Sequence, residues 1–283
     1  ALMKITHIIR AEEHLSNTPK QILIFEALNF PLPTFAHISL IFAQDRTKLS
    51  KRHGATSIGQ FREMGFLPHA LFNFLALLGW SPKDDREFFT KEELINLFDL
   101  DAVNKAPAIF DIDKLKWMNH KYIVDTDSER LCEQVLPYFK KMGWTQNCDE
   151  KTVMIVDTVK GNMDLTLDCL NVAKPFFEGV EFPDSVDDQR VILTNEAIAT
   201  FKYIIEHIDQ VNFTKDDIES FLQGLKEATG IPGKKLYHPI RVALFGSRNG
   251  PELWKVFLSL GREDVKKRLK AALAEVENRL GTL

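Results

Sequence analysis

The sequence of 283 residues lacks any long hydrophobic run, and it contains only 14 Gly and 12 Pro. Its longest apolar stretches, such as the one within residues 71–80, fall far short of the ~20 residues that cross a bilayer, which excludes a membrane-spanning protein. Hydrophobic residues make up 45% of the chain and charged residues 27%, and these fractions exclude a disordered or collagen-like chain. At roughly 150 residues per domain, we expect about two globular domains.

Cysteine is also scarce. Cys132, Cys148 and Cys169 match neither a zinc-site spacing nor a CxxC redox motif, and an odd number of cysteines is a poor basis for a disulfide framework. We therefore expect a reducing compartment. The beginning, ALMKITHIIR, has no initiator Met and lacks the features of a secretory signal or a transit peptide, so we expect a start altered by processing or truncation.

No single sign of charge dominates, because the net charge is only −4. The distribution is uneven, however: residues 1–70 carry 8 Lys and Arg against 5 Asp and Glu, residues 71–224 carry 16 against 29, and residues 225–283 carry 12 against 6. Two basic ends around an acidic middle could provide a polyanion-binding surface that the total charge conceals. Solvated helix faces are the simpler explanation of the charges alone.

The first fifty residues alternate strand and helix signals. A short β-branched run at residues 4–9 is followed by a helix pattern at 19–28, with Thr18 as its expected N-cap, and by a second apolar run at 36–42. This order predicts a parallel α/β piece. Because the piece is too short for a complete doubly wound sheet, we expect the closing half of one.

Helical patterns dominate from residue 68 onward. The segment HALFNFLALLG ends at Gly79, and Thr90 with Glu93 forms a capping box that opens KEELINLF. The acidic stretch at residues 181–190 is the best candidate for an exposed connection. Further amphipathic helices are expected at residues 128–142, 151–159, 193–207, 215–228 and 263–280.

The most informative segment is QDRTKLSKRHGATS, the loop after the second predicted strand. Lys48, Lys51 and Arg52 lie within five residues of one another, just past the carboxyl end of a parallel strand, where open α/β sheets bind their ligands. A loop with two lysines and free backbone N–H groups can wrap a triphosphate and stabilise charge that develops at phosphorus. In isolation, such a five-residue match is more often a solvated basic loop.

A second polar cluster, RAEEH, stands about 35 residues upstream at the end of the first predicted strand. Arg10 is a plausible bidentate clamp for a carboxylate, because its planar guanidinium matches two oxygens. Glu13 could accept hydrogen bonds from an adenine amine or a ribose hydroxyl, and His14 could stack against a base. Alone, this cluster would be an exposed, salt-bridged turn.

Six segments taken in order carry a family resemblance. The chain resembles the later part of a bacterial-type glutamyl-tRNA synthetase, and the residues IGQFREMGFLP are similar to the organellar enzymes of plants and their cyanobacterial relatives. The segments that carry the resemblance are HIIRAEEHLSNTPKQ, PTFAHISLI, KLSKRHGATS, FREMGFLPHALFNFLALLGWS, VNKAPAIFDIDKLKWMNHKYI and GKKLYHPIRVALFGSRNGPEL.

The resemblance implies a mainly α fold with an α/β N-terminal piece. Residues 1–57 would form the C-terminal part of a class I synthetase Rossmann-like catalytic domain that carries the KLSKR loop. Residues 58–120 would form the stem-contact region, and residues 121–283 an all-helical anticodon-binding domain. The chain would be a monomer, and it would lie in a chloroplast or mitochondrion, with the bacterial cytoplasm as the alternative.

The resemblance also assigns roles to residues. It implies that Lys48 and Lys51 are catalytic, that Arg10 binds the side-chain carboxylate of L-glutamate, and that no side-chain metal site is needed, since Mg²⁺ arrives with ATP. The implied partners are L-glutamate and tRNA(Glu), with tRNA(Gln) as a second candidate. The implied ATP-binding residues are Glu13, His14, Lys48, Leu49, Ser50, Lys51 and Arg52.

The implied reaction has two steps. The α-carboxylate of glutamate attacks the α-phosphorus of ATP and releases pyrophosphate, and the terminal ribose of the tRNA then takes the glutamyl group. The first half of such a catalytic domain carries a His-x-Gly-His motif that binds ATP phosphates, and this sequence has none. We therefore expect that the chain alone does not aminoacylate tRNA.

Three alternatives remain. A non-catalytic tRNA-binding fragment or split subunit would use the basic C-terminal segment and exposed aromatic side chains. A glutaminyl-tRNA synthetase is disfavoured because its relatives use β-barrels for the anticodon, and the glutamyl-queuosine-forming paralogues are disfavoured because they lack an anticodon domain. The candidate tRNA contacts are Lys234, Lys235, Arg241 and Arg248, although Arg241 could equally be a buried structural arginine.

Overall fold

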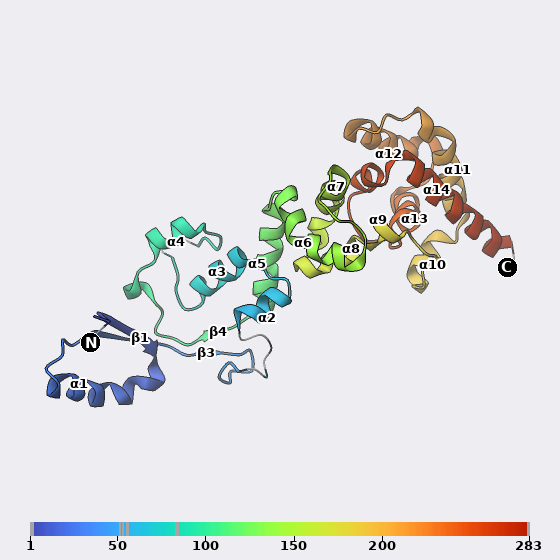
Figure 1. Cartoon of the computed structure of the whole chain (residues 1–283). Coiled ribbons are helices and arrows are strands. Elements are labelled where there is room, and N and C mark those ends of the chain that lie inside the picture. The colour runs from blue at the N-terminus through green and yellow to red at the C-terminus, as the bar shows by residue number, and fades with distance from the viewer. Residues whose placement is uncertain (1–2, 51, 53, 55–56, 83–84, 282–283) are drawn as a thin grey trace. The chain divides into compact units, whose positions relative to one another are not determined.

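The chain forms two compact units, unit 1 (residues 1–122) and unit 2 (residues 123–283), whose elements are labelled in Figure 1. The expected division into three segments, 1–57, 58–120 and 121–283, stays a prediction. No helix within the described part is both long and apolar enough to cross a membrane. The computed structural model describes residues 3–50, 52, 54, 57–82 and 85–281.

Unit 1 combines two small parallel sheets with short helices. The expected α/β piece followed by helices is thereby confirmed. The elements of unit 1 are β1 (His7–Ala11), η1 (Glu12–Asn17), α1 (Thr18–Ala27), β2 (Thr34–Ile38), β3 (Ile41–Phe42), α2 (Ile58–Glu63), α3 (Pro68–Leu77), α4 (Lys91–Leu97), η3 (Leu100–Ala102), β4 (Ala108–Ile109) and α5 (Ile112–Asp125), whose last residues belong to unit 2.

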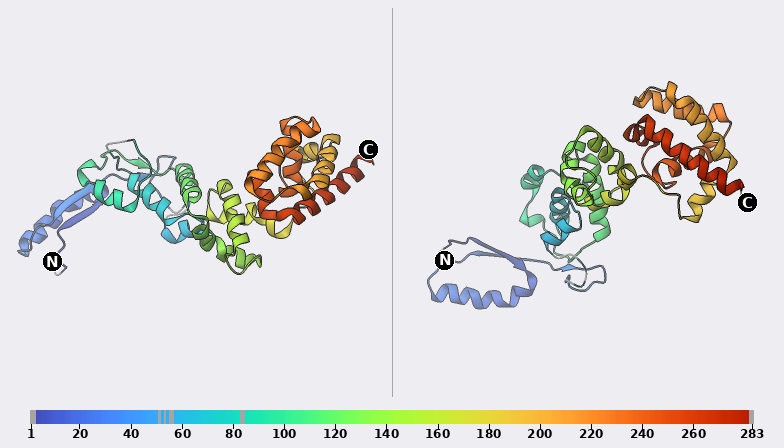
Figure 2. Two further views of the ribbon diagram at one scale, coloured as in Figure 1. Left: turned by 90° about the horizontal axis from the view of Figure 1, so that it is seen from above. Right: turned by 45° about the vertical axis from the view of Figure 1, so that its right-hand side comes forward.

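The N-terminal piece is a strand, helix and strand in which β1 pairs with β2 in parallel. Figures 1 and 2 show α1 running beside this pair. The expected capping role of Thr18 is wrong, because Thr18 is already inside α1 and Asn17 occupies the N-cap. The Thr18 hydroxyl instead contacts the side chains of Arg10 and His37, and it donates to the His14 carbonyl oxygen at 3.3 Å.

The second predicted strand is two strands with different partners. β2 ends at Ile38 and pairs with β1, whereas β3 begins at Ile41 and pairs in parallel with β4. At the break, Ser39 Oγ donates a hydrogen bond of 2.6 Å to the Lys105 carbonyl oxygen. The prediction of one strand over residues 36–42 is therefore wrong, because a periodic apolar run does not reveal a change of pairing partner.

Two helix signals in unit 1 are confirmed. The segment HALFNFLALLG forms α3, and the chain leaves it through Gly79, whose φ of 99° is in the region that favours glycine. The capping box at the start of α4 is present, because Glu93 N donates to Thr90 Oγ1 at 3.1 Å and Thr90 N donates to Glu93 Oε2 at 2.8 Å. Both signals are local, which is why the sequence reveals them.

A buried amide holds the helical part of unit 1 together. Asn73 in α3 is fully buried, and its Nδ2 donates to the Glu87 carbonyl oxygen at 2.8 Å. Its Oδ1 accepts from Phe89 N at 2.7 Å and from the Tyr122 hydroxyl at 2.9 Å. Because both ends of the amide are paired, its burial costs little, and it joins α3, α5 and the segment before α4.

The regular elements in the described residues of unit 2 are all helices, as expected. The predicted helix at 128–142 is α6 with the same bounds, and the last predicted helix belongs to a longer element that is kinked at Gly261. The elements of unit 2 are α6 (Ser128–Met142), α7 (Glu150–Val159), η4 (Lys160–Asn162), η5 (Thr166–Asp168), α8 (Cys169–Val172), α9 (Lys174–Glu178), α10 (Val186–Ile192), α11 (Asn195–His207), η6 (Ile208–Gln210), α12 (Lys215–Thr229), α13 (Gly233–Phe245) and α14 (Leu253–Gly281).

The expected exposed connection at residues 181–190 is wrong in its second half. Ser185 caps α10 by accepting a hydrogen bond of 3.5 Å from Asp188 N. Asp188 is 9% exposed, and its Oδ1 accepts a bond of 3.1 Å from Arg248 N. Its carboxylate is buried because it binds a backbone group 60 residues away, a contact that no local pattern reveals.

The cysteines also depart from expectation. Cys132 and Cys148 form a disulfide with their Cα atoms 6.0 Å apart, whereas Cys169 is a free, buried thiol. Burial raises the pKa of the Cys169 thiol to about 12. Gly143, at a φ of 74°, ends α6 and lets the chain return so that Cys148 meets Cys132. The three cysteines are therefore one disulfide pair and one buried thiol in the core.

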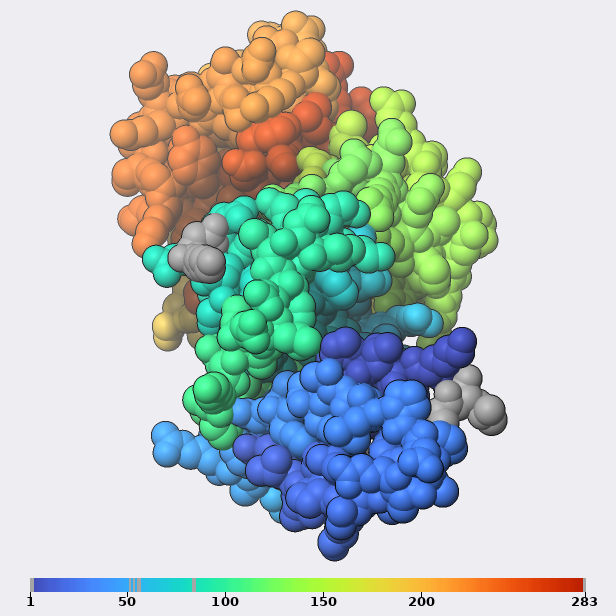
Figure 3. Space-filling model, turned by 90° about the vertical axis from the view of Figure 1, so that its left-hand side faces the viewer, coloured from blue at the N-terminus to red at the C-terminus, as the bar shows by residue number. Residues whose placement is uncertain are grey.

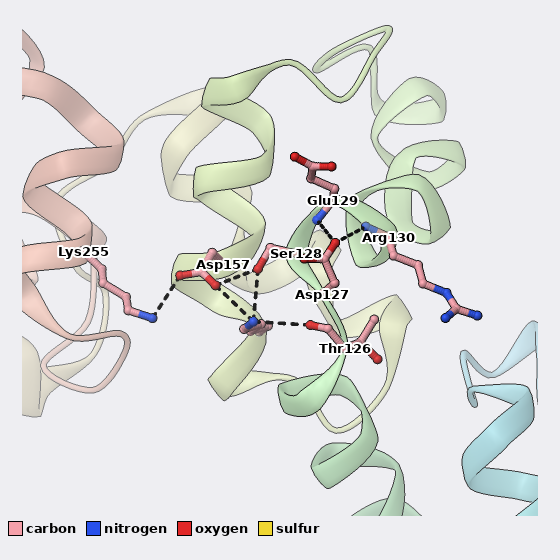
Figure 4. A network of polar contacts seen from close by, with 8 residues as sticks. Thr126, Asp127, Ser128, Glu129, Arg130, Asp157 and Lys255 are labelled. Carbon is pink, nitrogen blue, oxygen red and sulfur yellow. Dashed lines mark hydrogen bonds and ion pairs between the residues drawn. The ribbon is translucent and has the colours of Figure 1, made fainter. Parts of the chain in front are cut away.

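A polar network centred on Asp157 of α7 joins three parts of unit 2 (Figure 4). Its Oδ1 accepts from Ser128 Oγ at 2.7 Å and lies 3.1 Å from Lys160 Nζ, while its Oδ2 lies 3.1 Å from Lys255 Nζ of α14. Lys160 Nζ also donates to Ser128 Oγ at 3.1 Å and to the Thr126 carbonyl oxygen at 3.4 Å. Partial burial alone would raise the pKa of Asp157, but these bonds lower it to about 2.

We expect the Asp157→Asn variant to lose about 1 kcal/mol of stability at pH 7, a figure reduced for the partial exposure of this carboxylate. Because the folded pKa of about 2 lies below the ordinary value of 3.8, the carboxylate stabilises the fold above pH 4. That contribution is lost as the pH falls from 4 to 2. Urea unfolding from pH 7 to pH 2 would measure it, with the exposed Asp184→Asn as control, and equal losses in both variants would contradict the role.

Candidate catalytic half-site and RNA surface

The KLSKR segment begins on a tight turn that folds back onto β3. Ala43 N donates to the Thr47 carbonyl oxygen at 2.9 Å, and Phe42 and Lys48 form an antiparallel bridge. Arg46 completes the turn with a φ of 61°, an uncommon conformation for a residue other than glycine. This turn holds Lys48 beside the end of β3, and the role of the segment as a phosphate-binding loop stays a prediction.

Lys48 reaches across to the RAEEH cluster. Its Nζ lies 2.7 Å from Glu13 Oε2, and both side chains are exposed. The hydrogen bond and the charge of Lys48 lower the pKa of Glu13, which therefore stays ionised. The two clusters that the sequence places 35 residues apart thus meet at one site, but in an exposed ion pair of this kind the partners separate at little cost.

Arg10 lies on β1 in a partly buried position. Its Nη2 donates to Thr18 Oγ1 at 2.8 Å, and Thr18 Oγ1 also lies 2.9 Å from His37 Nε2. The guanidinium carbon is 5.5 Å from the centre of the Phe35 ring. Arg10 Nε is buried and has no acceptor among the described residues, so the guanidinium retains a donor that an added carboxylate could satisfy.

The remaining predicted ATP-binding residues are only partly described. Arg52 Nη2 donates to Thr47 Oγ1 at 3.1 Å, so this cation is also held on the turn. His14 Nε2 lies 3.9 Å from Glu13 Oε1. Leu49 and Ser50, which follow the bridge at Lys48, are half-buried, and Lys51 lies outside the described residues.

Unit 2 brings two of the four predicted tRNA contacts together. Arg241 of α13 is half-buried, and its Nη1 donates to the Arg248 carbonyl oxygen at 3.2 Å in the following loop. Burial lowers the pKa of Arg241. Arg248 Nη2 lies 2.9 Å from Asp187 Oδ2. A Cβ atom at Gly250 would lie 2.6 Å from Phe245 Cε1, so this loop packs closely on the helix before it.

The predicted lysines lie at the start of α13. Lys234 is exposed, and Lys235 Nζ lies 2.8 Å from Glu196 Oε1 of α11. His238 follows on the same helix, and its pKa is lowered by burial and by the charges of Arg241, Lys234 and Arg248. Three of the four predicted tRNA contacts therefore raise the positive potential around His238.

Sequence reasoning missed several residues that shape these sites. Thr18 accepts a hydrogen bond from the guanidinium of Arg10 and also contacts His37, and Asp187 and Asp188 hold the loop at Arg248. The position of Thr18 shortly after RAEEH could have indicated a contact with Arg10. The same position is equally typical of a helix cap. No signal within the sequence connects an acidic segment with a basic loop 60 residues later.

Two family models match the chain. The model described as "tRNA synthetases class I (E and Q), catalytic domain" matches residues 1–117. The model described as "Anticodon binding domain" matches residues 130–273, just over half of the chain. Together they define a class I aminoacyl-tRNA synthetase of the glutamate and glutamine group.

Similar proteins narrow the class further. The chain is 42% identical to a protein named glutamate–tRNA ligase 2 of Caldanaerobacter subterraneus subsp. tengcongensis, over 98% of this chain and 58% of that protein. It is 44% identical to the glutamate–tRNA ligase of Carboxydothermus hydrogenoformans, over 94% of this chain and 57% of that protein. A crystal structure of a glutamate–tRNA ligase from Elizabethkingia meningosepticum in complex with its amino acid matches with a TM-score of 0.81 at 32% identity, over 97% of this chain and 58% of that one.

The chain therefore belongs to the glutamate–tRNA ligase family, and it spans about 58% of the length of the curated relatives it matches. It corresponds to the later part of the catalytic domain and the anticodon-binding domain, as its resemblance implied. These relatives are bacterial, and the expected likeness to organellar enzymes stays a prediction.

Proposed function

We propose that this chain supplies the glutamate-binding and triphosphate-binding half of a glutamate–tRNA ligase active site, together with the tRNA-reading domain. The observation that carries the proposal is the meeting of Lys48 with Glu13 beside the partly buried Arg10. The substrates would be ATP, L-glutamate and tRNA(Glu), with tRNA(Gln) as a second candidate. Without the phosphate-binding motif that the sequence lacks, we expect no aminoacylation by this chain alone.

The adenylation step joins two anions, so its barrier depends on charge. Lys48 and Lys51 would hold the triphosphate and offset the charge that grows as the bond to pyrophosphate breaks. Arg52, held on the same turn, would add a third cation. For Lys48 to reach a phosphate it must leave Glu13, which then becomes free to accept hydrogen bonds from the nucleotide.

Mg²⁺ would enter with ATP and would supply further neutralisation of phosphate charge. Among the described residues, no group of three or more His, Cys, Asp or Glu side chains could hold a metal ion. Mg²⁺ usually keeps several waters and binds through substrate phosphates, which is why we expect it to arrive with ATP. The chain's own contribution would therefore be its cations and Arg10.

Selection of glutamate would rest on Arg10. A side-chain carboxylate could pair with both the buried Nε and an Nη of the guanidinium. Glutamine would leave the guanidinium without an anion in a partly buried place, which costs several kcal/mol. Thr18 would orient the guanidinium toward the ligand by accepting a hydrogen bond from Arg10 Nη2.

We expect tRNA binding by unit 2 to depend steeply on salt. If Lys234, Lys235, Arg241 and Arg248 each contact a phosphate, affinity should fall about 50-fold (single-stranded RNA) to about 150-fold (duplex) between 50 and 200 mM salt. The experiment is a titration of tRNA(Glu) with the full chain at several salt concentrations. Replacing Lys234 and Lys235 together by Ala should flatten the dependence.

The matched control for this titration replaces Lys140 and Lys141, an exposed lysine pair at the end of α6, by Ala. This pair should leave the salt dependence unchanged. An affinity that hardly varies with salt, or an equal effect of both double substitutions, would remove the proposed surface.

A non-catalytic tRNA-binding fragment or split subunit is the alternative. It is supported by the anticodon-binding model, which matches residues 130–273. The two functions differ in whether a complementary polypeptide restores ATP–pyrophosphate exchange.

A further inference from the structure

Unit 2 contains a cavity of about 670 Å³ that none of the proposed tRNA contacts lines. Part of its lining comes from α14 beyond the kink at Gly261. The apolar part comes from buried residues of α9, α10 and α13, namely Phe176, Ile192, Val242 and Ala243. The segment 179–183, which joins α9 to α10, also lines the cavity. Its volume lies within the usual range of small-molecule sites.

Helix α14 uses its charges differently on two of its sides. Figure 3 shows the red atoms of α14 against the orange atoms of α12, and α14 also packs on η6. Toward η6, Lys266 Nζ pairs with Asp209 Oδ2. Toward the cavity, three consecutive or nearly consecutive charged residues line the wall, namely Asp264, Lys267 and Arg268. Charges of both signs therefore face the cavity from one helix.

Asp264 and Arg268 are four residues apart, a spacing at which an acid and a base meet on a helix surface. They form no ion pair among the described residues, and Arg268 Nη1 instead donates to the Leu244 carbonyl oxygen at 2.8 Å. Burial lowers the pKa of Arg268, and the nearby charge of Asp264 raises it in part. A half-buried carboxylate and a half-buried guanidinium thus line one cavity without being joined.

The other charged groups of the lining are paired or exposed. Glu275 Oε1 lies 2.6 Å from Arg279 Nε, and Glu178 Oε1 accepts a hydrogen bond of 2.8 Å from Trp144 Nε1. The remaining two are exposed to solvent, namely Glu181 and Lys267. The acid and the base one helix turn apart are therefore the charges that a ligand in the cavity would meet with the least competition from water.

The segment 179–183 has space on two sides, because it lines this cavity and also a second one of about 240 Å³. Gly179 begins the segment with a φ of 87°, in the region that favours glycine. Phe182 is held by Arg279, whose guanidinium carbon lies 3.9 Å from the centre of the ring. The segment therefore has room to move toward a ligand and to pack the ring of Phe182 against it.

We propose that this cavity binds a small zwitterion with an aromatic body, of which a free aromatic amino acid is the simplest example. Its ammonium group pairs with Asp264, its carboxylate pairs with Arg268, and its ring packs on the apolar lining and on Phe182. A ligand with only one charge would leave one of the two half-buried groups without a partner. The site lies in unit 2, apart from Arg10 in unit 1, and it does not rest on the proposed function.

The test is a calorimetric titration of the full chain with three probes: L-tryptophan, tryptamine, which lacks the carboxylate, and N-acetyl-L-tryptophan, which lacks the ammonium group. We expect L-tryptophan to bind 1:1 with a dissociation constant of about 100 μM, and each analogue to bind at least about 10-fold more weakly. Arg268→Gln should weaken L-tryptophan about 10-fold and leave tryptamine unchanged, whereas Asp264→Asn should weaken L-tryptophan and leave N-acetyl-L-tryptophan unchanged.

Two matched pairs of variants on α14 place the site. Ala272 lines the cavity, whereas Ala274 is exposed and does not, so Ala272→Trp should abolish binding of L-tryptophan and Ala274→Trp should not change it. Lys270→Gln, at an exposed lysine outside the lining, is the control for Arg268→Gln and should bind as the unaltered chain does.

Circular dichroism should show all of these variants folded. Three results would overturn the proposal: L-tryptophan that fails to bind at about 5 mM, an analogue that binds as tightly as L-tryptophan, or equal effects of Ala272→Trp and Ala274→Trp. The comparison of the three probes needs only the unaltered chain, so it decides the question even if a variant fails to fold.

Discussion

Replacing Lys48 by Ala is expected to lower ATP–pyrophosphate exchange by about 100-fold, the usual effect of losing one preorganised contact to developing charge. The assay requires a complete active site. A fusion protein would provide it, in which the part of the Caldanaerobacter ligase that this chain does not match is joined ahead of this chain. Because Lys48 would act on charge that grows in the transition state, the loss should fall on kcat more than on the KM for ATP.

The ion pair with Glu13 offers a way to separate two roles of Lys48. Glu13→Gln removes the pair but leaves the ammonium group, so exchange should fall less than in Lys48→Ala. If the two variants lose the same activity, Lys48 acts only by holding Glu13. Lys91→Ala, an exposed lysine at the start of α4, is the control and should leave exchange unchanged.

Replacing Arg10 by Gln is expected to raise the KM for glutamate by about 100-fold or more, because a partly buried carboxylate loses its charged partner. The affinity for tRNA should stay nearly unchanged, because unit 2 carries the proposed tRNA contacts. Arg10→Lys should lie between, since lysine keeps the charge but loses the two-pronged geometry. Glutamate-dependent pyrophosphate exchange in the same joined protein would give these values.

Arg62→Gln, which alters an exposed arginine on α2, is the control for Arg10→Gln. It should change neither the KM for glutamate nor the affinity for tRNA. If Arg10→Gln lowers both affinities alike, the substitution has damaged the fold. If the KM for glutamate stays within about threefold of the parent value, a change worth less than 1 kcal/mol, Arg10 does not bind the carboxylate.

The local parts of the fold could be predicted from the sequence. The bounds of α6 and the capping box at Thr90 follow from signals within four residues of each helix end. The parallel α/β piece also follows from the order of its elements. Long-range features could not be predicted this way: the break between β2 and β3 depends on β4, some 65 residues later.

In the candidate site, too, the local residue clusters could be predicted and the long-range contacts could not. The clusters RAEEH and KLSKR can be found by residue type and spacing, and their family likeness gives each residue an expected role. The contact of Thr18 with Arg10 and His37 could not be found, because a threonine before a helix proline is an equally good cap. The disulfide of Cys132 with Cys148 was missed because the odd number of cysteines argued against it.

The family, the helices and the two polar clusters can be recognised from the amino-acid sequence, because motif spacing and helix caps are properties of neighbouring residues. Three contacts became visible only with the fold: Lys48 meets Glu13, Asp188 holds the loop at Arg248, and Thr18 meets both Arg10 and His37. Such contacts depend on the path of the chain between distant residues. That path is set by the packing of whole elements, so no short segment encodes it.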